Sequence, residues 1–445
     1  MSTKGQIVNP VGARFDHVDA MRGIAVLLMI WMHTGDGWLA APFRQGASFD
    51  LVRSPGGLAA PLFLLLVGIS LGLRWSQETF LAGGLAGSRG NSALRSELAR
   101  GLQILLLGYL LRVQMWMLDG AGYRHWTAWA AALPLTFAYL GGYLLLGRWA
   151  RGRLPGRRAL GWAGAAGFSW ALGFWSLWAF TPARVEGVLR QDVLQAIGAS
   201  LVLVACFGRA LGVVRHPLAW PCLLAAALVA LLTPAMRAWV PGPLPGPLAG
   251  YLGYWNPGPG RTPAGLFPLF PWLAYPFVGV ALGRHFGLRG PRGALTSALV
   301  LALFGLLLAA LSSESRAPVR ALMAAEPWLQ QPLRVLYRVA MGLILGGLAV
   351  VLSRPRVPGR RGLLLLGQAS LAVYWVHLEL AFGIASRPVS RRLALDGWLL
   401  GWALLSLAMV GFAWLWLRRR ELWLRLVGRF GAGGAAIDGR SGVSG

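Results

Sequence analysis

Charged residues are scarce in this 445-residue chain, and lysine is almost absent. Asp, Glu, Lys and Arg make up 13% of the sequence, about half the share that a soluble protein usually carries. Lys4 is the single lysine among 42 basic residues. The two cysteines, Cys206 and Cys222, give neither a disulfide framework nor a metal-binding spacing. The sequence also has neither a P-loop nor a G-x-G-x-x-G Rossmann motif.

Apolar residues, in contrast, account for 56% of the chain, and the mean hydropathy is +0.58. They are gathered into runs of about 20 residues, the length that an α-helix needs to cross a bilayer. The pattern predicts an all-α, polytopic integral membrane protein, a helical bundle with about eleven or twelve transmembrane helices. The predicted spans are Asp19–Trp38, Gly57–Trp75, Leu98–Leu118, Trp126–Leu146, Leu160–Phe180, Asp192–Gly208, Leu218–Trp239, Leu266–Gly283, Ala294–Leu311, Leu333–Ser353, Gly362–Ala385 and Gly397–Leu417.

The net charge of +27 indicates membrane topology rather than nucleic-acid binding, because the arginines lie in short loops between the apolar runs. With a cytoplasmic N-terminus, the inward segments hold 27 of the 42 basic residues and the outward loops hold 15. The positive-inside rule therefore predicts that both termini are cytoplasmic. The preference for arginine over lysine, with abundant Ala and Gly, indicates a GC-rich bacterial genome and hence a multi-pass protein of the bacterial inner membrane.

The chain is expected to form one transmembrane domain over residues 1–430, followed by a disordered cytoplasmic tail over residues 431–445. The tail is rich in Gly and Ala. The longest outer loop, Pro241–Pro263, is rich in Pro and Gly and is expected to be irregular. Glycine pairs four residues apart, as at Gly68 and Gly72, indicate close packing between helices.

The first apolar run carries the most informative residues, in the segment DAMRGIAVLLMIWMH from Asp19 to His33. Arg22 and His33 are 11 residues apart, so on a helix they project from one face roughly 16 Å apart along the axis. Asp19 lies one turn before Arg22 and is a natural partner for it. An ionisable side chain inside an apolar span is costly and by default marks a functional site. One helix face therefore holds a cation near the cytoplasmic boundary and a proton-accepting group near the outer one.

Three further ionisable residues are predicted to lie on the outer side with His33. Asp36 follows His33 by one turn, and His377 and Glu379 lie in the segment YWVHLEL of the eleventh span. His377 and Glu379 are two residues apart and therefore point to different faces of their helix. A carboxylate at this depth needs a partner, for which Arg190 is a candidate.

Five segments spread over nearly the whole chain carry a family resemblance when they are taken together and in order. They are RFDHVDAMRGIAVLLMIWMH (Arg14–His33), LAAPLFLLLVGISLGL (Leu58–Leu73), RQDVLQAIGASL (Arg190–Leu201), FPLFPWLAYPFVGVALGR (Phe267–Arg284) and LGQASLAVYWVHLEL (Leu366–Leu380). They resemble the heparan-α-glucosaminide N-acetyltransferase-like family of transmembrane acyltransferases, in its bacterial branch. The spacing from Arg22 to His33 also resembles the wider membrane O-acyltransferase group, where a histidine at that place serves catalysis.

The chain departs from this family at one position that matters for chemistry. The animal heparan enzyme is expected to carry its active histidine in the loop after the first helix, where this chain has Arg44. The histidine role therefore carries over to His33 alone, and the heparan substrate does not carry over.

The resemblance implies an enzyme that moves an acyl group, usually acetyl, from cytoplasmic acyl-CoA to an acceptor on the outer face. Because the nucleotide of CoA is multiply charged, it would stay on the cytoplasmic side while the thioester is threaded into the bundle. Arginine suits the phosphates because its planar fork makes paired, charge-assisted hydrogen bonds. Arg22, held by Asp19, and the loop arginines Arg95 and Arg100 are therefore the candidates for binding acetyl-CoA or another acyl-CoA.

At the outer end, the resemblance gives His33 the role of general base on an acceptor hydroxyl or amine. Asp36 is close enough in sequence to orient the imidazole, and His377 and Glu379 are candidates for the same catalytic site. A covalent acyl-histidine intermediate is the alternative chemistry. The acceptor is expected to be a saccharide, free or lipid-linked, and neither a metal nor a nucleic acid is expected as a partner. Assembly as a homodimer is left open.

The competing interpretation is a twelve-helix secondary transporter or flippase. Transporters of that kind usually have two related halves and broken helices at matching positions. Neither feature is visible in this sequence, and the outer histidine after an Arg-Gly pair has no special place in such a protein. The sequence therefore favours the acyltransferase.

Overall fold

The computed structural model describes residues 15–81, 86–119, 124–153, 156–180, 187–212, 219–239, 246–252 and 265–435. This part of the chain folds into helices, with two isolated bridges as its only β-type pairings. The predicted all-α polytopic membrane architecture is confirmed. The α-helices are α1 (Asp16–Trp38), α2 (Gly46–Gly56), α3 (Ala59–Leu81), α4 (Ala86–Asp119), α5 (Trp126–Ala150), α6 (Gly156–Phe180), α8 (Val193–Ala210), α9 (Trp220–Ala238), α10 (Gly246–Leu252), α11 (Leu269–Trp272), α12 (Ala274–Ser312), α13 (Ala317–Ala325), α14 (Gln330–Leu352), α15 (Arg360–Gln368), α16 (Ser370–Phe382) and α17 (Leu395–Ala435).

Seven helices of the described residues are long and apolar enough to cross a membrane, and up to nine spans result if each of two bent helix pairs is one span. The sequence predicted eleven or twelve spans. Helices α1 and α6 coincide with predicted spans but are not among the seven. Helix α1 carries Arg22, His33 and Asp36, and these polar side chains lower its hydropathy. The predicted span Ala294–Leu311 falls within α12, and the second half of the predicted span Leu266–Gly283 belongs to the same helix.

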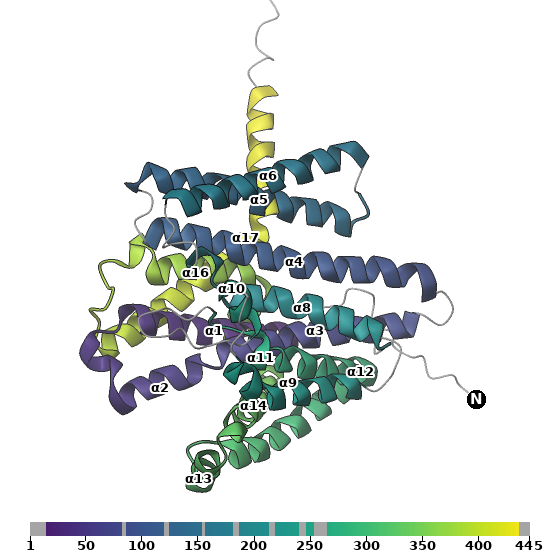
Figure 1. The fold of residues 1–445 in the computed structure, drawn as a ribbon, viewed down its shortest axis with the longest axis vertical. Helices are drawn as coiled ribbons and strands as arrows, with labels where there is room; N and C mark the ends of the chain where they lie inside the picture. The colour runs from purple at the N-terminus through teal and green to yellow at the C-terminus, as the bar shows by residue number, and fades with distance from the viewer. Residues whose placement is uncertain are drawn as a thin grey trace, which may run out of the picture.

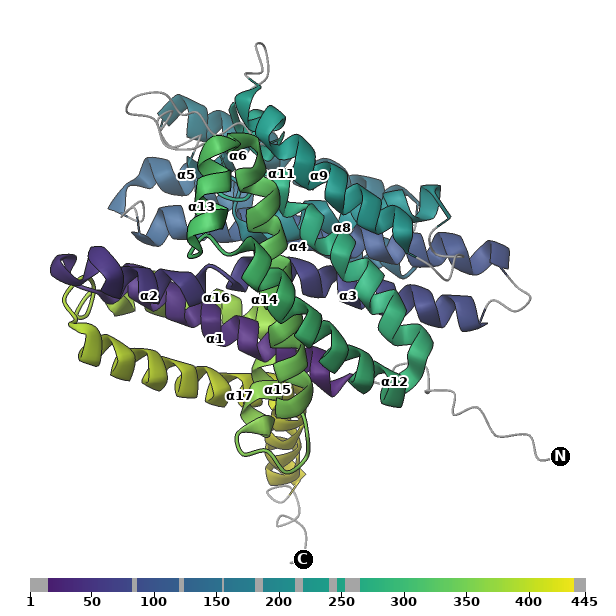
Figure 2. The ribbon, with the colours of Figure 1, turned by 90° about the horizontal axis from the view of Figure 1, so that it is seen from below.

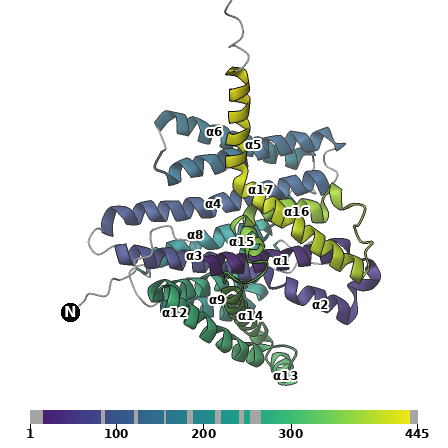
Figure 3. The same cartoon turned by 180° about the vertical axis from the view of Figure 1, so that it is seen from behind.

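The helices form a bundle in which the segments that carry the predicted site lie at the centre. Figure 1 shows α4, α5 and α6 on one side, α1, α3, α8 and α16 in the middle, and α9, α12 and α14 on the other side. Helix α1 lies between α3 and α17 in the view from below (Figure 2), and it packs against both. From behind, α17 crosses the outside of the bundle next to α16, and its last turns project beyond α5 and α6 (Figure 3).

Glycines bring the backbones of α3 and α12 into direct contact, as the glycine pairs predicted. A Cβ atom on Gly68 would lie 2.0 Å from the carbonyl oxygen of Pro276, and one on Gly279 would lie 2.1 Å from that of Leu65. Such spacing leaves no room for a side chain, so only glycine allows the approach. The second half of α12 packs instead along α14, where a Cβ on Gly305 would lie 2.8 Å from the carbonyl oxygen of Ala340.

The predicted span Gly362–Ala385 is broken into two helices. Helices α15 and α16 meet at Ala369, where the chain bends by 90°. Helix α15 lies tightly against the start of α1, because a Cβ on Gly367 would come within 1.9 Å of the backbone oxygen of Asp19. Irregular backbone at membrane depth is tolerated where it is buried in protein or lines a cavity, and this break does line one.

Two expectations for irregular segments need adjustment. Helix α17 extends to Ala435, so the first residues of the predicted disordered tail are helical, and residues 436–445 lie outside the described residues. Most of the predicted irregular loop Pro241–Pro263 also lies outside them, but the short helix α10 forms within it.

Candidate active site

Two histidines from distant parts of the sequence meet near the C-terminal ends of α1 and α16. The Nδ1 atom of His33 lies 2.8 Å from the Nε2 atom of His377. Their rings are nearly parallel, with an interplanar angle of 12° and centroids 5.1 Å apart. His377 is completely buried, whereas His33 is partly exposed. The structure thus brings together two residues that the sequence assigned to one site.

The hydrogen bonds of this pair fix which ring nitrogen carries the proton. His377 Nδ1 lies 2.9 Å from the carbonyl oxygen of Val373, and because a carbonyl only accepts hydrogen bonds, Nδ1 must be the donor. In a neutral ring, His377 Nε2 is then an acceptor, and it receives the Nδ1–H of His33. This assignment leaves Nε2 of His33 with a lone pair, as a proton acceptor.

The ends of α1 and α16 are held together directly beside the histidines. Gly37 allows close contact, since a Cβ there would lie 2.8 Å from the carbonyl oxygen of Ala381. The indole Nε1 of Trp38 donates to the same carbonyl at 3.0 Å. The Phe382 ring meets the His33 ring edge-on, with centroids 5.5 Å apart. The pair is therefore set by rigid helix packing and not by a loop.

At the other end of α1, Arg22 is held by two neighbours. Its Nη1 donates to the Oδ1 atom of Asp19 at 2.8 Å, and its Nη2 donates to the hydroxyl of Ser70 in α3 at 2.6 Å. The Asp19 partner predicted from the i, i+3 spacing is confirmed. Asp19 is buried, whereas about a third of the Arg22 side chain, 29%, remains exposed. The guanidinium is thus oriented by α1 and α3 while part of it still faces open space.

That open space is a cavity lined by three arginines. Arg22, Arg74 and Arg100 surround both a cavity of 670 Å³ and an adjoining one of 410 Å³. Asp19 lies in the wall of the larger cavity. Three cations around one opening form a site for a multiply charged anion, and volumes of this order match those of ligand pockets.

The smaller cavity extends from the arginines into the bundle between apolar walls. Helix α3 lines it from Phe63 to Arg74, eleven residues or about 16 Å of helix. Helix α8 lines it from Val193 to Leu201, about 12 Å. The cavity thus combines a cationic mouth with a narrow apolar interior.

The break between α15 and α16 forms one wall of this cavity. Residues 367–372 line it, and Gln368 lies in the walls of both cavities. Further along α16, the Tyr374 side chain lines the cavity as well. The Tyr374 ring in turn contacts the His377 ring, whereas His33 and His377 are not among the described residues that line the cavity.

Two residues that the sequence proposed for the site, Arg95 and Asp36, have neighbours other than those expected. Arg95 approaches the turn after α5, where a Cβ on Gly152 would lie 3.2 Å from an Arg95 guanidinium nitrogen. It is not among the described residues that line either cavity. Asp36 has Arg44 and Arg53 as its charged neighbours, and its backbone oxygen accepts a hydrogen bond from Arg44. The hydrogen-bond partner of His33 is His377 and not Asp36.

Glu379 contacts α4 through the side chain of Gln114. Its Oε1 atom accepts a hydrogen bond of 2.6 Å from the Gln114 side-chain amide, and Gln114 in turn accepts one of 2.8 Å from the Trp375 indole. The carboxylate therefore has a polar partner inside the bundle, as predicted, and Gln114 is one such partner. The role of Glu379 in a site shared with His33 stays a prediction.

Sequence reasoning missed Arg74 and Gln368, which line both cavities. Arg74 follows Ser70 by one helical turn and so shares the face of α3 that receives Arg22. This i, i+4 pair was visible at the end of an apolar run. Gln368 belongs to the polar interruption Gly367-Gln368 of an apolar segment, which could have indicated the break.

Comparison with known protein families gives one match. The family model described as heparan-alpha-glucosaminide N-acetyltransferase, catalytic, matches residues 14–315. This range contains His33 and the three cavity arginines, whereas His377 lies beyond it. No individual curated protein matches the chain.

Proposed function

The chain belongs to the heparan-α-glucosaminide N-acetyltransferase family, and we propose that it transfers an acyl group from acyl-CoA across the membrane to a saccharide. Members of this family use acetyl-CoA as donor, so acetyl is the proposed acyl group. The donor would bind from the cytoplasmic side and the acceptor, free or lipid-linked, from the extracytoplasmic side. The bacterial inner membrane is the proposed location.

The observation that carries this proposal is the pairing of two chemically different sites at the ends of α1. Arg22 contributes to a cavity with three arginines, and His33 contributes to a part-buried histidine pair. About 16 Å of helix separates them. A donor with a charged nucleotide at one end and a reactive thioester at the end of a slim, largely uncharged arm requires this separation.

The arginine cavity suits the nucleotide part of acyl-CoA. Arg22, Arg74 and Arg100 would bind its phosphates through charge-assisted hydrogen bonds. The pantetheine arm would follow the apolar walls formed by α3 and α8, which hold no competing charge between Phe63 and Val67 or between Val193 and Leu201. The thioester would then lie beside α16, near the histidine pair.

The histidine pair suits the proton transfer. Nε2 of His33 would accept the proton of the acceptor hydroxyl or amine as its oxygen or nitrogen attacks the thioester carbon. The developing positive charge on His33 would be stabilised through its Nδ1–H, which donates to His377. His377 thus takes the orienting part that a carboxylate has in a Ser-His-Asp triad. The C–S bond then breaks, and the thiolate of CoA takes up the released proton.

A broken helix such as α15–α16 also occurs in transporters, where it lines a substrate site. Here the break lines a cavity that has three arginines in its wall and a further wall residue, Tyr374, in contact with His377. The family match concerns an acetyltransferase. Both observations favour the enzyme over a transporter or flippase.

Radiolabelled acetyl-CoA tests this function directly. Membranes from cells that produce the protein should incorporate label into their glycan or lipid-linked saccharide fraction, and membranes from cells without the protein should not. Acetyl-CoA should also raise the unfolding temperature of the protein purified in detergent, because a ligand that binds the folded state stabilises it. A protein that neither incorporates label nor gains stability would contradict the proposal.

A further inference from the structure

Tyr374 lies where the donor cavity meets the histidine pair. Its side chain lines the cavity of 410 Å³ and keeps 6% of its surface exposed. Its ring meets the His377 ring edge-on, at 70° and with centroids 5.7 Å apart. The other neighbour of the His377 ring is His33. Tyr374 therefore stands between the space for the donor and the base that would activate the acceptor.

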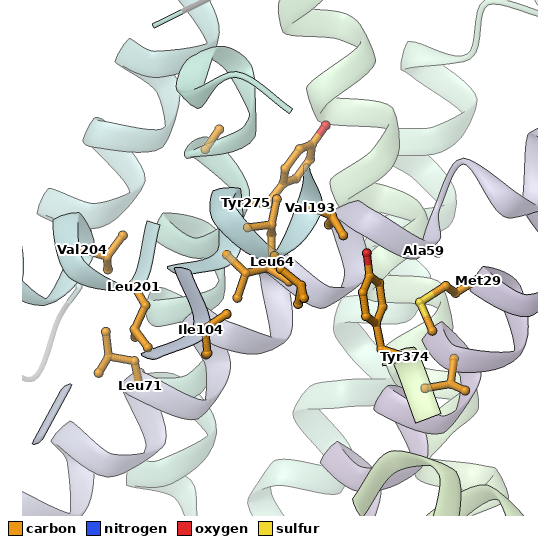
Figure 4. Packing of buried hydrophobic residues seen from close by; sticks show 14 of the residues in the cluster. Met29, Ala59, Leu64, Leu71, Ile104, Val193, Leu201, Val204, Tyr275 and Tyr374 are labelled. Atoms are coloured by element: carbon orange, nitrogen blue, oxygen red, sulfur yellow. The ribbon is translucent and has the colours of Figure 1, made fainter. Parts of the chain in front are cut away.

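The hydroxyl of Tyr374 has no hydrogen-bond partner within the described part of the chain. Buried polar groups in folded proteins are nearly always paired, so an unpaired hydroxyl on a cavity wall indicates a group supplied by a ligand or by water. The same packed cluster offers a contrast, because the Tyr275 hydroxyl is sealed away from the surface and has the Arg338 side chain as its polar neighbour. Figure 4 shows both rings in this cluster, together with Val193 and Leu64.

We propose that the Tyr374 hydroxyl donates a hydrogen bond to the carbonyl oxygen of the donor thioester and stabilises the oxyanion that forms there. This inference rests on the proposed acyl-transfer function. It adds a catalytic residue that neither the spacing of charged residues nor the arginine cavity revealed.

The step balances without a further reagent. The acceptor oxygen or nitrogen forms a bond to the thioester carbon and gives its proton to His33, and the carbonyl electron pair moves onto oxygen. Tyr374 keeps its own proton throughout and only donates a hydrogen bond to that oxygen. When the carbonyl re-forms, the C–S bond breaks and CoA leaves as the thiolate, which takes the proton from His33.

Tyrosine suits this role because a phenol remains a neutral donor at neutral pH. Arg112, which approaches it from α4, and Asp192, at the start of α8, are the charged groups that act on Tyr374. A hydrogen-bond donor that is already oriented in a site shielded from water stabilises the charge of the transition state more strongly than water does. It needs no reorganisation during the reaction.

The test compares Tyr374→Phe with Tyr275→Phe in the label-transfer assay. Each variant removes one phenolic hydroxyl from the same cluster, but of these two tyrosines only Tyr374 lines the cavity. Tyr374→Phe should lower kcat by about 10²- to 10³-fold, the loss seen when one oxyanion donor is removed. Its KM for acetyl-CoA and its unfolding temperature should stay close to those of the wild type, and Tyr275→Phe should keep normal kcat.

Three outcomes would overturn the inference. Normal kcat in Tyr374→Phe, or a raised KM with kcat retained, would make Tyr374 a wall residue of the cavity. An equal loss in Tyr275→Phe would assign the effect to packing. If the wild type transfers label and His33→Ala does not, each of these three outcomes leaves the proposed function standing and removes only the role of Tyr374. A wild type without transfer overturns both.

Discussion

His33→Ala is expected to lower the rate of acyl transfer by about 10²- to 10⁴-fold, the usual contribution of a general base. The substitution removes the Nε2 lone pair that the hydrogen bonds to His377 and Val373 leave available. The measurement is the initial rate of label transfer from acetyl-CoA into the saccharide fraction of membranes. Acetyl-CoA should still protect the variant against thermal unfolding, because the arginine cavity lies at the other end of α1.

Variants of His377 provide the matched control for this prediction. Glutamine can supply an oxygen in place of Nε2 to accept the Nδ1–H of His33, whereas leucine cannot. His377→Leu should therefore lose more activity than His377→Gln, and neither should lose more than His33→Ala. A folded His33→Ala protein with near-normal turnover would falsify the assignment of the base. Equal losses in the two His377 variants would show that His377 does not act through its hydrogen bond.

Arg22→Ala is expected to raise the KM for acetyl-CoA by about 10- to 100-fold, because a hydrogen bond to a charged group is worth about 1.5–3 kcal/mol. Arg74→Ala and Arg100→Ala should act in the same direction, since both arginines line the same cavity. The effect should disappear with S-acetyl-pantetheine, which lacks the nucleotide. The measurement is the KM of each variant for the two donors.

Arg95→Ala is the control that the structure provides for the donor site. This arginine has the same charge and lies five residues before Arg100, but it contacts the turn after α5, so its removal should leave the KM unchanged. Removing Arg22 also leaves the buried carboxylate of Asp19 without its ion-pair partner. The double variant Asp19→Asn, Arg22→Ala removes this unpaired charge, so its KM for acetyl-CoA reports the loss of donor binding alone. An Arg22→Ala protein that is folded and binds acetyl-CoA normally would show that Arg22 only anchors the helix.

The parts of the site that lie on one helix were predictable from the sequence. The spacing of Asp19, Arg22 and His33 fixes their common face through helical geometry alone, and the structure places Arg22 at a cavity and His33 in a polar pair. The all-α membrane class was also predictable, because the length and hydropathy of each run are local properties, whereas the predicted eleven or twelve spans exceed the seven to nine of the described residues.

The contacts between helices were not predictable in the same way. Arg95 and Arg100 looked equivalent in the sequence, yet five residues turn a side chain to another face of the helix, and the neighbouring helices decide which face meets the cavity. The sequence offered arginine as a partner for Glu379 and did not indicate Gln114 of the neighbouring helix, which donates a hydrogen bond to it. The break between α15 and α16 at Ala369 was not predicted, because apolar residues continue on both sides of it.

The sidedness of the reaction tests the central claim most directly. Sealed right-side-out membrane vesicles that contain the protein would receive labelled acetyl-CoA either in their interior, which corresponds to the cytoplasm, or in the outer medium. If acyl transfer runs from the cytoplasm to the outer face, label should reach saccharide only when acetyl-CoA is inside the vesicles. The labelled product should then be accessible to reagents added to the outer medium. Transfer only from acetyl-CoA in the outer medium, or a product confined to the interior, would contradict it.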